Sequence, residues 1–203
     1  MRVGTPADDP SDNPSDDLTS LAAALGTVFG RATWQCVEGV DRRVLVTGAA
    51  PGEWLLLAGP GQPDAVVRWL ESLRAPGEFV TVVDLTHDRA VVRISGALAM
   101  DVLAKESAVD LSDRPGGAPD GRALRTEVAG LATELIRTDI AGIPSYLLHC
   151  ERSSGKHLFD SLLDSGAEHG IDVDGFSLPG FDSSPPGDHP VGRAPTLDGT
   201  CGS

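Results

Sequence analysis

The sequence is poor in positive charge, and this shortage excludes several classes of partner. Of its 203 residues, 30 are acidic and 16 are basic, and the only two lysines are Lys105 and Lys156. The net charge of −14 opposes binding to phosphate backbones and to anionic lipid surfaces. We therefore expect neither a nucleic acid nor a membrane as partner.

Cysteines and long apolar runs are also scarce. The three cysteines are Cys36, Cys150 and Cys201, and an odd number without a close pair predicts neither a disulfide framework nor a metal clip. The first 17 residues hold no apolar segment typical of a secretory signal, and the longest apolar runs, such as 54–58, are too short to span a bilayer. These features predict a cytoplasmic protein.

The apolar pattern is confined to the middle of the chain, where 40% hydrophobic content overall allows a core. Residues 1–17 are mostly Pro, Asp and Ser, which predicts a disordered acidic tail. Residues 176–203 are rich in Pro and Gly and predict a second disordered tail. Between them, residues 18–175 show no linker and predict one domain.

The periodicity of this middle region predicts alternating helices and strands. Helical spacing of apolar residues predicts helices over 18–28 and 63–73, another opened by Ser95-Gly96, and a last one capped by Ser153 or Ser154. Strands are predicted at 43–47, 53–58, 79–85 (a buried strand), 89–94, 124–128, 131–137 and 145–152. Because no strict βαβ repeat appears, we predict an α+β fold of ferredoxin-like strand–helix layers with mainly antiparallel sheets.

His87 is the first candidate for chemistry. It lies beside Asp84 and Asp88 in a predicted turn, and a histidine oriented by a carboxylate would serve as a general base. The alternative is a turn histidine that bonds backbone or water. We favour this second interpretation because no nucleophile is signalled nearby.

Metal binding would need His149 with Cys150, or Cys36 with His87. Neighbouring residues on a strand point to opposite faces, so His149 and Cys150 are poorly placed to share one ion. We expect Cys150 to be a small core residue. The sequence therefore assigns no metal ligand.

Phosphate binding would rest on Gly59-Pro60-Gly61, which precedes a predicted helix. The GxGxxG and Walker patterns are absent, so we interpret these residues as a turn into the helix. Trp54 is expected in a core or an interface, with a ligand cleft as the alternative. No catalytic or cofactor-binding residue is assigned.

Four segments, taken in order, resemble the gamma subunit of heterotetrameric sarcosine oxidase. They are GEWLLLAGPG, VVDLTHDRAVVRISGALAMDVLAKESAVDL, LRTEVAGLATELIRTD and SYLLHCERSSGKHLFDSLL, and they cover most of residues 50–166. The elements that match the family are Glu53–Leu57, Asp84–Arg89, Gly96–Leu103, Asp110-Leu111, Arg125-Thr126 and Arg152-Ser153. The chain departs from the family at Lys105–Ala108, where members often carry a cysteine.

This resemblance implies a fold related to the folate-binding domain of glycine-cleavage aminomethyltransferases. It also implies a non-catalytic subunit of a complex that oxidises sarcosine to glycine, passes the one-carbon unit to tetrahydrofolate and makes hydrogen peroxide. The expected partners are the larger flavoprotein subunits, alpha and beta, and a small zinc subunit, delta. FAD, FMN, NAD, tetrahydrofolate and zinc are expected on these partners and none on this chain.

Two alternatives to the subunit remain. One is a free-standing folate-binding or aminomethyltransferase-like protein, although the K-G-C-Y-x-G-Q-E element of the folate-dependent iron–sulfur repair branch is absent. The other is an unrelated acidic interaction module.

Overall fold

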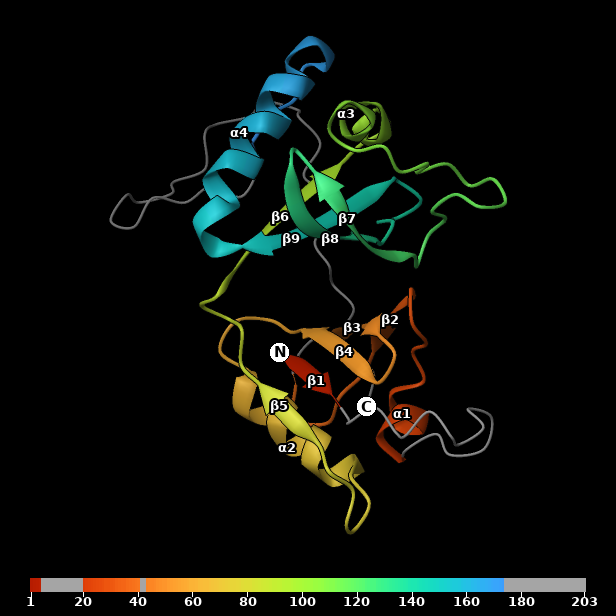
Figure 1. Cartoon of the computed structure of the whole chain (residues 1–203), viewed down its shortest axis with the longest axis vertical. Coiled ribbons are helices and arrows are strands. Elements are labelled where there is room, and N and C mark those ends of the chain that lie inside the picture. Colours follow the sequence, from red (N-terminus) through yellow and green to blue (C-terminus); the bar gives the residue numbers. More distant parts are fainter. Residues whose placement is uncertain (5–19, 41–42, 174–203) are drawn as a thin grey trace.

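The computed structural model describes residues 1–4, 20–40 and 43–173. Within them the chain forms four layers, in the order helices, sheet, sheet, helices (Figure 1). All ladders between named strands in these residues are antiparallel. The predicted α+β fold with antiparallel sheets is therefore confirmed.

The first sheet has the strand order β2-β3-β4-β1-β5. Its strands are β1 (Arg2–Gly4), β2 (Ala32–Gln35), β3 (Val44–Ala50), β4 (Glu53–Leu57) and β5 (Thr81–Val83). Two helices, α1 (Ser20–Leu25) and α2 (Pro63–Leu73), cover one face, and α2 begins at a proline, which has no amide hydrogen to leave unpaired there. The core between helices and sheet includes Val3, Leu21, Leu25, Val44, Val46, Leu56, Val66 and Leu70.

The second sheet has the strand order β6-β9-β8-β7. Its strands are β6 (Arg89–Ser95), β7 (Ala123–Val128), β8 (Leu131–Arg137) and β9 (Ser145–Glu151). The helices α3 (Ala99–Glu106) and α4 (Gly155–Gly166) cover its outer face, and two short 3-10 turns, η1 (Arg152–Ser154) and η2 (Ala167–His169), flank α4. The described part of the chain contains no helix with the length and apolar character needed to cross a bilayer.

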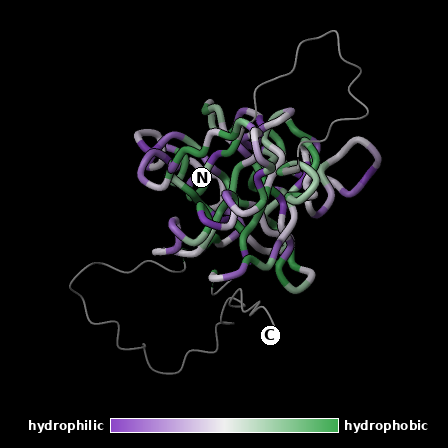
Figure 2. The backbone as a smooth tube through the Cα atoms, turned by 90° about the horizontal axis from the view of Figure 1, so that it is seen from below, coloured by the Kyte–Doolittle hydropathy of each residue, from purple (hydrophilic) through white to green (hydrophobic). Residues whose placement is uncertain are grey.

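The inner faces of the two sheets meet at a third, smaller core, which we call the seam. Period-2 alternation sends Leu45 into the seam while its neighbours Val44 and Val46 face the helices. The other seam residues are Ala32, Ala123, Ile136 and Leu147. Seen along the long axis, hydrophobic stretches run through the interior of the tube, and a strongly hydrophilic loop projects at its edge (Figure 2).

The prediction of a disordered tail over residues 1–17 is wrong for the first four. Arg2–Gly4 form β1, which pairs with β4 on one side and β5 on the other. Val3 is fully buried, and Arg2 pairs with Glu53. Order at these residues comes from pairing with distant strands, which local composition does not reveal. The rest of the first predicted tail, and all of 176–203, lie outside the described residues.

Three further local expectations need correction. The helix predicted over 18–28 ends at Leu25, since Gly26 adopts a φ of 58°, and Val28 is 69% exposed. The segment 79–85 is no buried strand: only Thr81–Val83 pair, at the edge of the sheet, and Phe79 is 68% exposed. The strand β2 was missed because its apolar alternation is short.

Candidate functional site

Two cavities border the seam and draw their walls from both sheets. The first, of about 230 Å³, lies between the segment after α1, strand β3, and the strands β7 and β8. Phe29 and Gly48 contribute from the first sheet, and Arg122, Arg125 and Glu134 contribute from the second. The second cavity, of about 200 Å³, lies at the ends of β2 and β4 opposite β6 and β9.

Glu134 is the only acidic residue that lines the first cavity. It sits opposite His149 in the β8–β9 ladder, and its Oε2 lies 3.6 Å from His149 Nδ1, beyond hydrogen-bond length. Burial opposes ionisation of this carboxyl, but His149, Arg125 and Arg89 outweigh it and lower its pKa. Glu134 is therefore held as a carboxylate among cations.

The first cavity has no activated nucleophile among its lining residues. Its one hydroxyl, Thr47 Oγ1, is buried and donates to the carbonyl of Leu55 at 3.1 Å. The Nε of Arg122 is buried without a hydrogen-bond partner. A lone carboxylate with guanidinium groups around it is suited to holding a polar group, whereas covalent catalysis needs a nucleophile beside a base.

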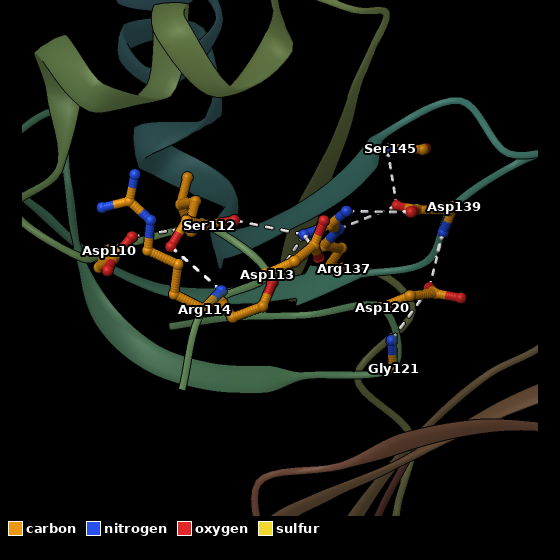
Figure 3. Close-up of polar contacts among 11 residues, drawn as sticks. Asp110, Ser112, Asp113, Arg114, Asp120, Gly121, Arg137, Asp139 and Ser145 are labelled. Atoms are coloured by element: carbon orange, nitrogen blue, oxygen red, sulfur yellow. Dashed lines mark hydrogen bonds and ion pairs between the residues drawn. The ribbon is translucent and has the colours of Figure 1, made fainter. Parts of the chain in front are cut away.

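Arg137 forms the densest polar cluster of the described residues (Figure 3). Its buried guanidinium donates to both carboxylate oxygens of Asp139, at 3.0 and 3.1 Å, and to Asp113 at 2.7 Å. It also donates to the carbonyls of Leu111 and Ala118 and lies 5.7 Å from the centroid of the Tyr146 ring. These partners satisfy the cation and fix the loop before β7, so we interpret the cluster as structural. In the sequence, the only hint of this cluster was an arginine at the end of an apolar strand, followed two residues later by Asp139.

His87 lies exposed in the turn between β5 and β6, as the turn interpretation predicted. Asp84 is occupied by the same turn, because its carboxylate accepts hydrogen bonds from the Thr86 amide at 2.9 Å and hydroxyl at 2.6 Å. The carbonyl of His87 accepts from Arg152 at 3.1 Å. The carboxylate of Asp88 is 3.9 Å from Arg89 Nε. The three candidate residues thus build a turn, and no carboxylate in the described part of the chain forms a hydrogen bond with the His87 ring.

The candidate metal ligands are kept apart. Cys150 lies in the core under α4, while His149 faces the opposite side of β9, as expected from strand geometry. Cys36 is disulfide-bonded, which the odd cysteine count had not predicted. Within 1–4, 20–40 and 43–173, no three His, Cys, Asp or Glu side chains come together as a metal site.

The remaining two predictions from sequence hold. Gly61 has a φ of 76° and turns the chain into α2, so Gly59-Pro60-Gly61 is a turn. Trp54 is buried in the first core, and its indole Nε1 donates to the Thr27 carbonyl at 2.8 Å. Sequence reasoning missed Glu134, Arg122 and Arg93, because the residues that line the two cavities are distant along the chain.

This chain is similar to aminomethyltransferases, to dimethylglycine dehydrogenases and to a chain of a sarcosine oxidase. The family model described as the GCVT N-terminal domain matches residues 38–177. Human mitochondrial dimethylglycine dehydrogenase is 30% identical over 134 residues, which are 66% of this chain and 15% of that protein. The aminomethyltransferase of Saccharopolyspora erythraea is 29% identical over 172 residues, 83% of this chain and 46% of that protein. The chain thus spans less than half the length of these relatives.

Two solved structures share the fold. One is a chain of heterotetrameric sarcosine oxidase from Corynebacterium sp. U-96 in complex with pyrrole 2-carboxylate, with a TM-score of 0.59 and 25% identity over 86% of this chain and 83% of that chain. The other is the glycine cleavage system aminomethyltransferase T from Bartonella henselae, with a TM-score of 0.53 and 16% identity over 80% of this chain and 42% of that chain. The family model covers more than half of the sequence, and the two sheets form the fold that the resemblance implied; the chain therefore belongs to the GCVT N-terminal domain family.

Proposed function

We propose that this chain is a non-catalytic gamma-type subunit of a heterotetrameric sarcosine oxidase complex. Such a complex oxidatively demethylates sarcosine to glycine and transfers the one-carbon unit to tetrahydrofolate. The observation that carries the proposal is reciprocal coverage, since the match to a sarcosine oxidase chain spans 86% of this chain and 83% of that one. A match over most of both chains supports an equivalent whole subunit, whereas the aminomethyltransferase structure is matched over 42% of its length.

The chemistry of the first cavity is consistent with a non-catalytic role for this chain. Its only carboxylate, Glu134, lies among cations, and its only hydroxyl, Thr47, is bonded to backbone. We propose that FAD, FMN, NAD and tetrahydrofolate bind to the larger subunits, alpha and beta, and zinc to the small subunit, delta. The assembled complex would then work in the cytoplasm.

Co-expression with the alpha and beta flavoprotein subunits of a sarcosine oxidase tests this proposal. We expect the chain to elute with a yellow flavoprotein on size exclusion, and the complex to produce peroxide when sarcosine is added. A permanent hetero-complex buries a large apolar interface, so omission of the chain should lower the yield and turnover of the flavoprotein. If the flavoprotein assembles and turns over equally well alone, the subunit proposal fails.

His87→Ala provides a matched control within that complex. Because His87 is exposed in a turn, its removal should leave sarcosine-dependent turnover within a few-fold of the parent. A loss of about 10²–10⁴-fold, the scale of general acid–base catalysis, would give His87 a catalytic role.

The family match supports a second candidate, a free-standing folate-binding or aminomethyltransferase-like protein. The aminomethyltransferase of Saccharopolyspora erythraea aligns with 83% of this chain, although with only 46% of its own length. Calorimetric titration of the lone chain with tetrahydrofolate separates the two candidates. Stoichiometric binding without a flavoprotein would favour the second one.

A further inference from the structure

The second cavity combines an apolar floor with two guanidinium groups. Its volume is about 200 Å³. Trp34 and Leu57 line it from the first sheet, and Leu147 lines it from the second, close to the seam. Arg43 and Arg93 supply the charge. Neither the family assignment nor the proposed subunit role involves this cavity.

Arg93 is a half-buried cation without a counter-ion. Its Nη1 donates to Ser145 Oγ at 2.5 Å and to Thr138 Oγ1 at 3.4 Å, and both acceptors are neutral hydroxyls. No carboxylate of the described residues lies within ion-pair distance of it. Burial accordingly lowers the pKa of Arg93, with no opposing charge to raise it. Removing a cation from water is unfavourable unless an anion accompanies it.

Arg137 provides an internal comparison, because it lies on the same sheet. It also donates to neutral acceptors, yet it is paired with Asp113 and Asp139. Arg93 donates to two neutral hydroxyls, and no carboxylate of residues 1–4, 20–40 and 43–173 pairs with it. Among the described residues, Arg93 therefore lacks the anionic partner that Arg137 has.

The unused donors of Arg93 are available to a ligand. Its hydrogen bonds come from Nη1, so Nη2 and Nε have no protein acceptor among the described residues. Neither nitrogen belongs to the fully buried atoms that lack a partner, which include Arg89 Nε and Arg122 Nε. This edge of a guanidinium is the one that receives a carboxylate through two parallel hydrogen bonds.

Arg43 and Trp34 give the cavity a flat wall. The Cζ of exposed Arg43 lies 5.7 Å from the centroid of the Trp34 ring, within the range of a cation–π contact. No ion pair engages Arg43 in the described part of the chain. A planar ring would find the indole and the side chains of Leu57 and Leu147 as apolar neighbours.

We propose that this cavity binds a small aromatic carboxylate, whose carboxyl group pairs with Arg93 and Arg43 and whose ring packs on Trp34, Leu57 and Leu147. The volume is below the range of about 300–1,000 Å³ for pockets of drug-sized ligands, so one ring suits it best. The ligand acts as the missing counter-ion of Arg93.

Titration of the full-length chain with benzoate tests the proposal. The readout is the indole N–H resonance of Trp34 in ¹⁵N–¹H correlation spectra, assigned with a Trp34→Phe variant, and calorimetry gives the affinity. We expect saturable binding with a dissociation constant on the order of 1 mM, as fits a ligand of this size. Benzamide has the same ring without the charge, and sulfate has charge without the ring, so both should bind at least tenfold more weakly.

Two substitutions test which arginine binds the carboxylate of benzoate. Arg93→Gln should weaken benzoate binding about tenfold or more, because a charge-assisted hydrogen-bonded pair is lost. Arg43→Gln changes an exposed side chain, retains the fold, and should weaken binding by a smaller factor. The matched control is Arg68→Gln, an exposed residue on α2 on the opposite face of the first sheet, which should bind as the parent does. Absence of a saturable shift, equal binding of benzamide, or indifference to both cavity substitutions would overturn the proposal.

Discussion

At the scale of single residues, Arg137 shows what a buried cation requires in this fold. Its guanidinium is satisfied by two carboxylates, two backbone carbonyls and an aromatic face. The hydrogen bonds to Asp139 hold the pKa of Arg137 above its ordinary value, so it stays charged at every working pH. This side chain ties the loop before β7 to the end of β8.

Arg137→Met should therefore be strongly destabilising. The change leaves the largely buried carboxylate of Asp139 and the carbonyls of Leu111 and Ala118 without their donor. We expect the free energy of unfolding, measured by urea titration, to fall by about 3–5 kcal/mol. Arg114→Met, on the exposed part of the same loop, is the control and should stay within about 0.5 kcal/mol. If the two changes lowered stability equally, the structural role of the Arg137 cluster would be contradicted.

Glu134 predicts a dependence of stability on pH. Because its pKa is lowered in the fold, its contribution is present above the ordinary glutamate pKa of about 4.3 and is lost as the pH falls through the lowered value. The stability gap between the parent and Glu134→Gln should be largest near about pH 6 and should close toward about pH 3. Urea titrations of both proteins across this range measure it. A gap that stays constant would show that the charge of Glu134 contributes nothing.

At the scale of elements, the three-residue strand β1 joins β4 to β5 in the first sheet. Val3 is fully buried between α1, α2 and the middle of the first sheet, with β4 and β5 paired on its two sides. Val3→Ala should lower the free energy of unfolding by roughly 2 kcal/mol through lost burial and a residual cavity. Val83→Ala on the neighbouring strand removes the same atoms from a 46% exposed side chain and should change it by less than about 0.5 kcal/mol.

The elements predicted from sequence are those whose apolar pattern is local. The strands predicted at 131–137 and 145–152 match β8 and β9 almost residue for residue. The helix predicted to begin at Pro63 matches the start of α2. The strand β1 could not be predicted, because both strands with which it pairs lie about 50 residues or more away along the chain. The exposure of Phe79 was missed for a related reason, since strand position in a sheet is a property of the tertiary fold.

The candidate site was less predictable than the fold. His87 stood out because carboxylates are its sequence neighbours, and the structure uses those carboxylates to build the turn. Glu134 and Arg93 gave no signal, because the first depends on cations from other strands and the second on the absence of an anion. Long-range electrostatics of this kind appears only once the strands are in register.

At the scale of the whole molecule, the seam should make the two sheets unfold together. Trp34, Trp54 and Trp69 all lie in the first half of the chain, so tryptophan fluorescence reports on the first sheet and its helices. Hydrogen exchange of the β8 and β9 amides reports on the second. We expect both probes to give one coincident transition in denaturant.

Ile136→Ala probes this coupling directly, because Ile136 is buried at the seam. Both probes should move together by about 2–5 kcal/mol. Val91→Ala, on an exposed position of β6, is the control and should move neither. A shift confined to the second sheet would mean that the halves unfold independently.

The position of β1 also has a consequence for biosynthesis. This strand is translated before β4 and β5, yet it lies between them, and the backbone bond from Met1 to Leu56 joins residues 55 positions apart. Closing such a long loop is slow compared with forming a hairpin. Because β5 pairs with β1 and not with β4, the outer edge of β1 stays unpaired until residues 81–83 have left the ribosome, and such an edge is a template for wrong strand pairing. Slower translation of the segment after residue 83 would give β5 time to cover this edge of β1 before later strands emerge.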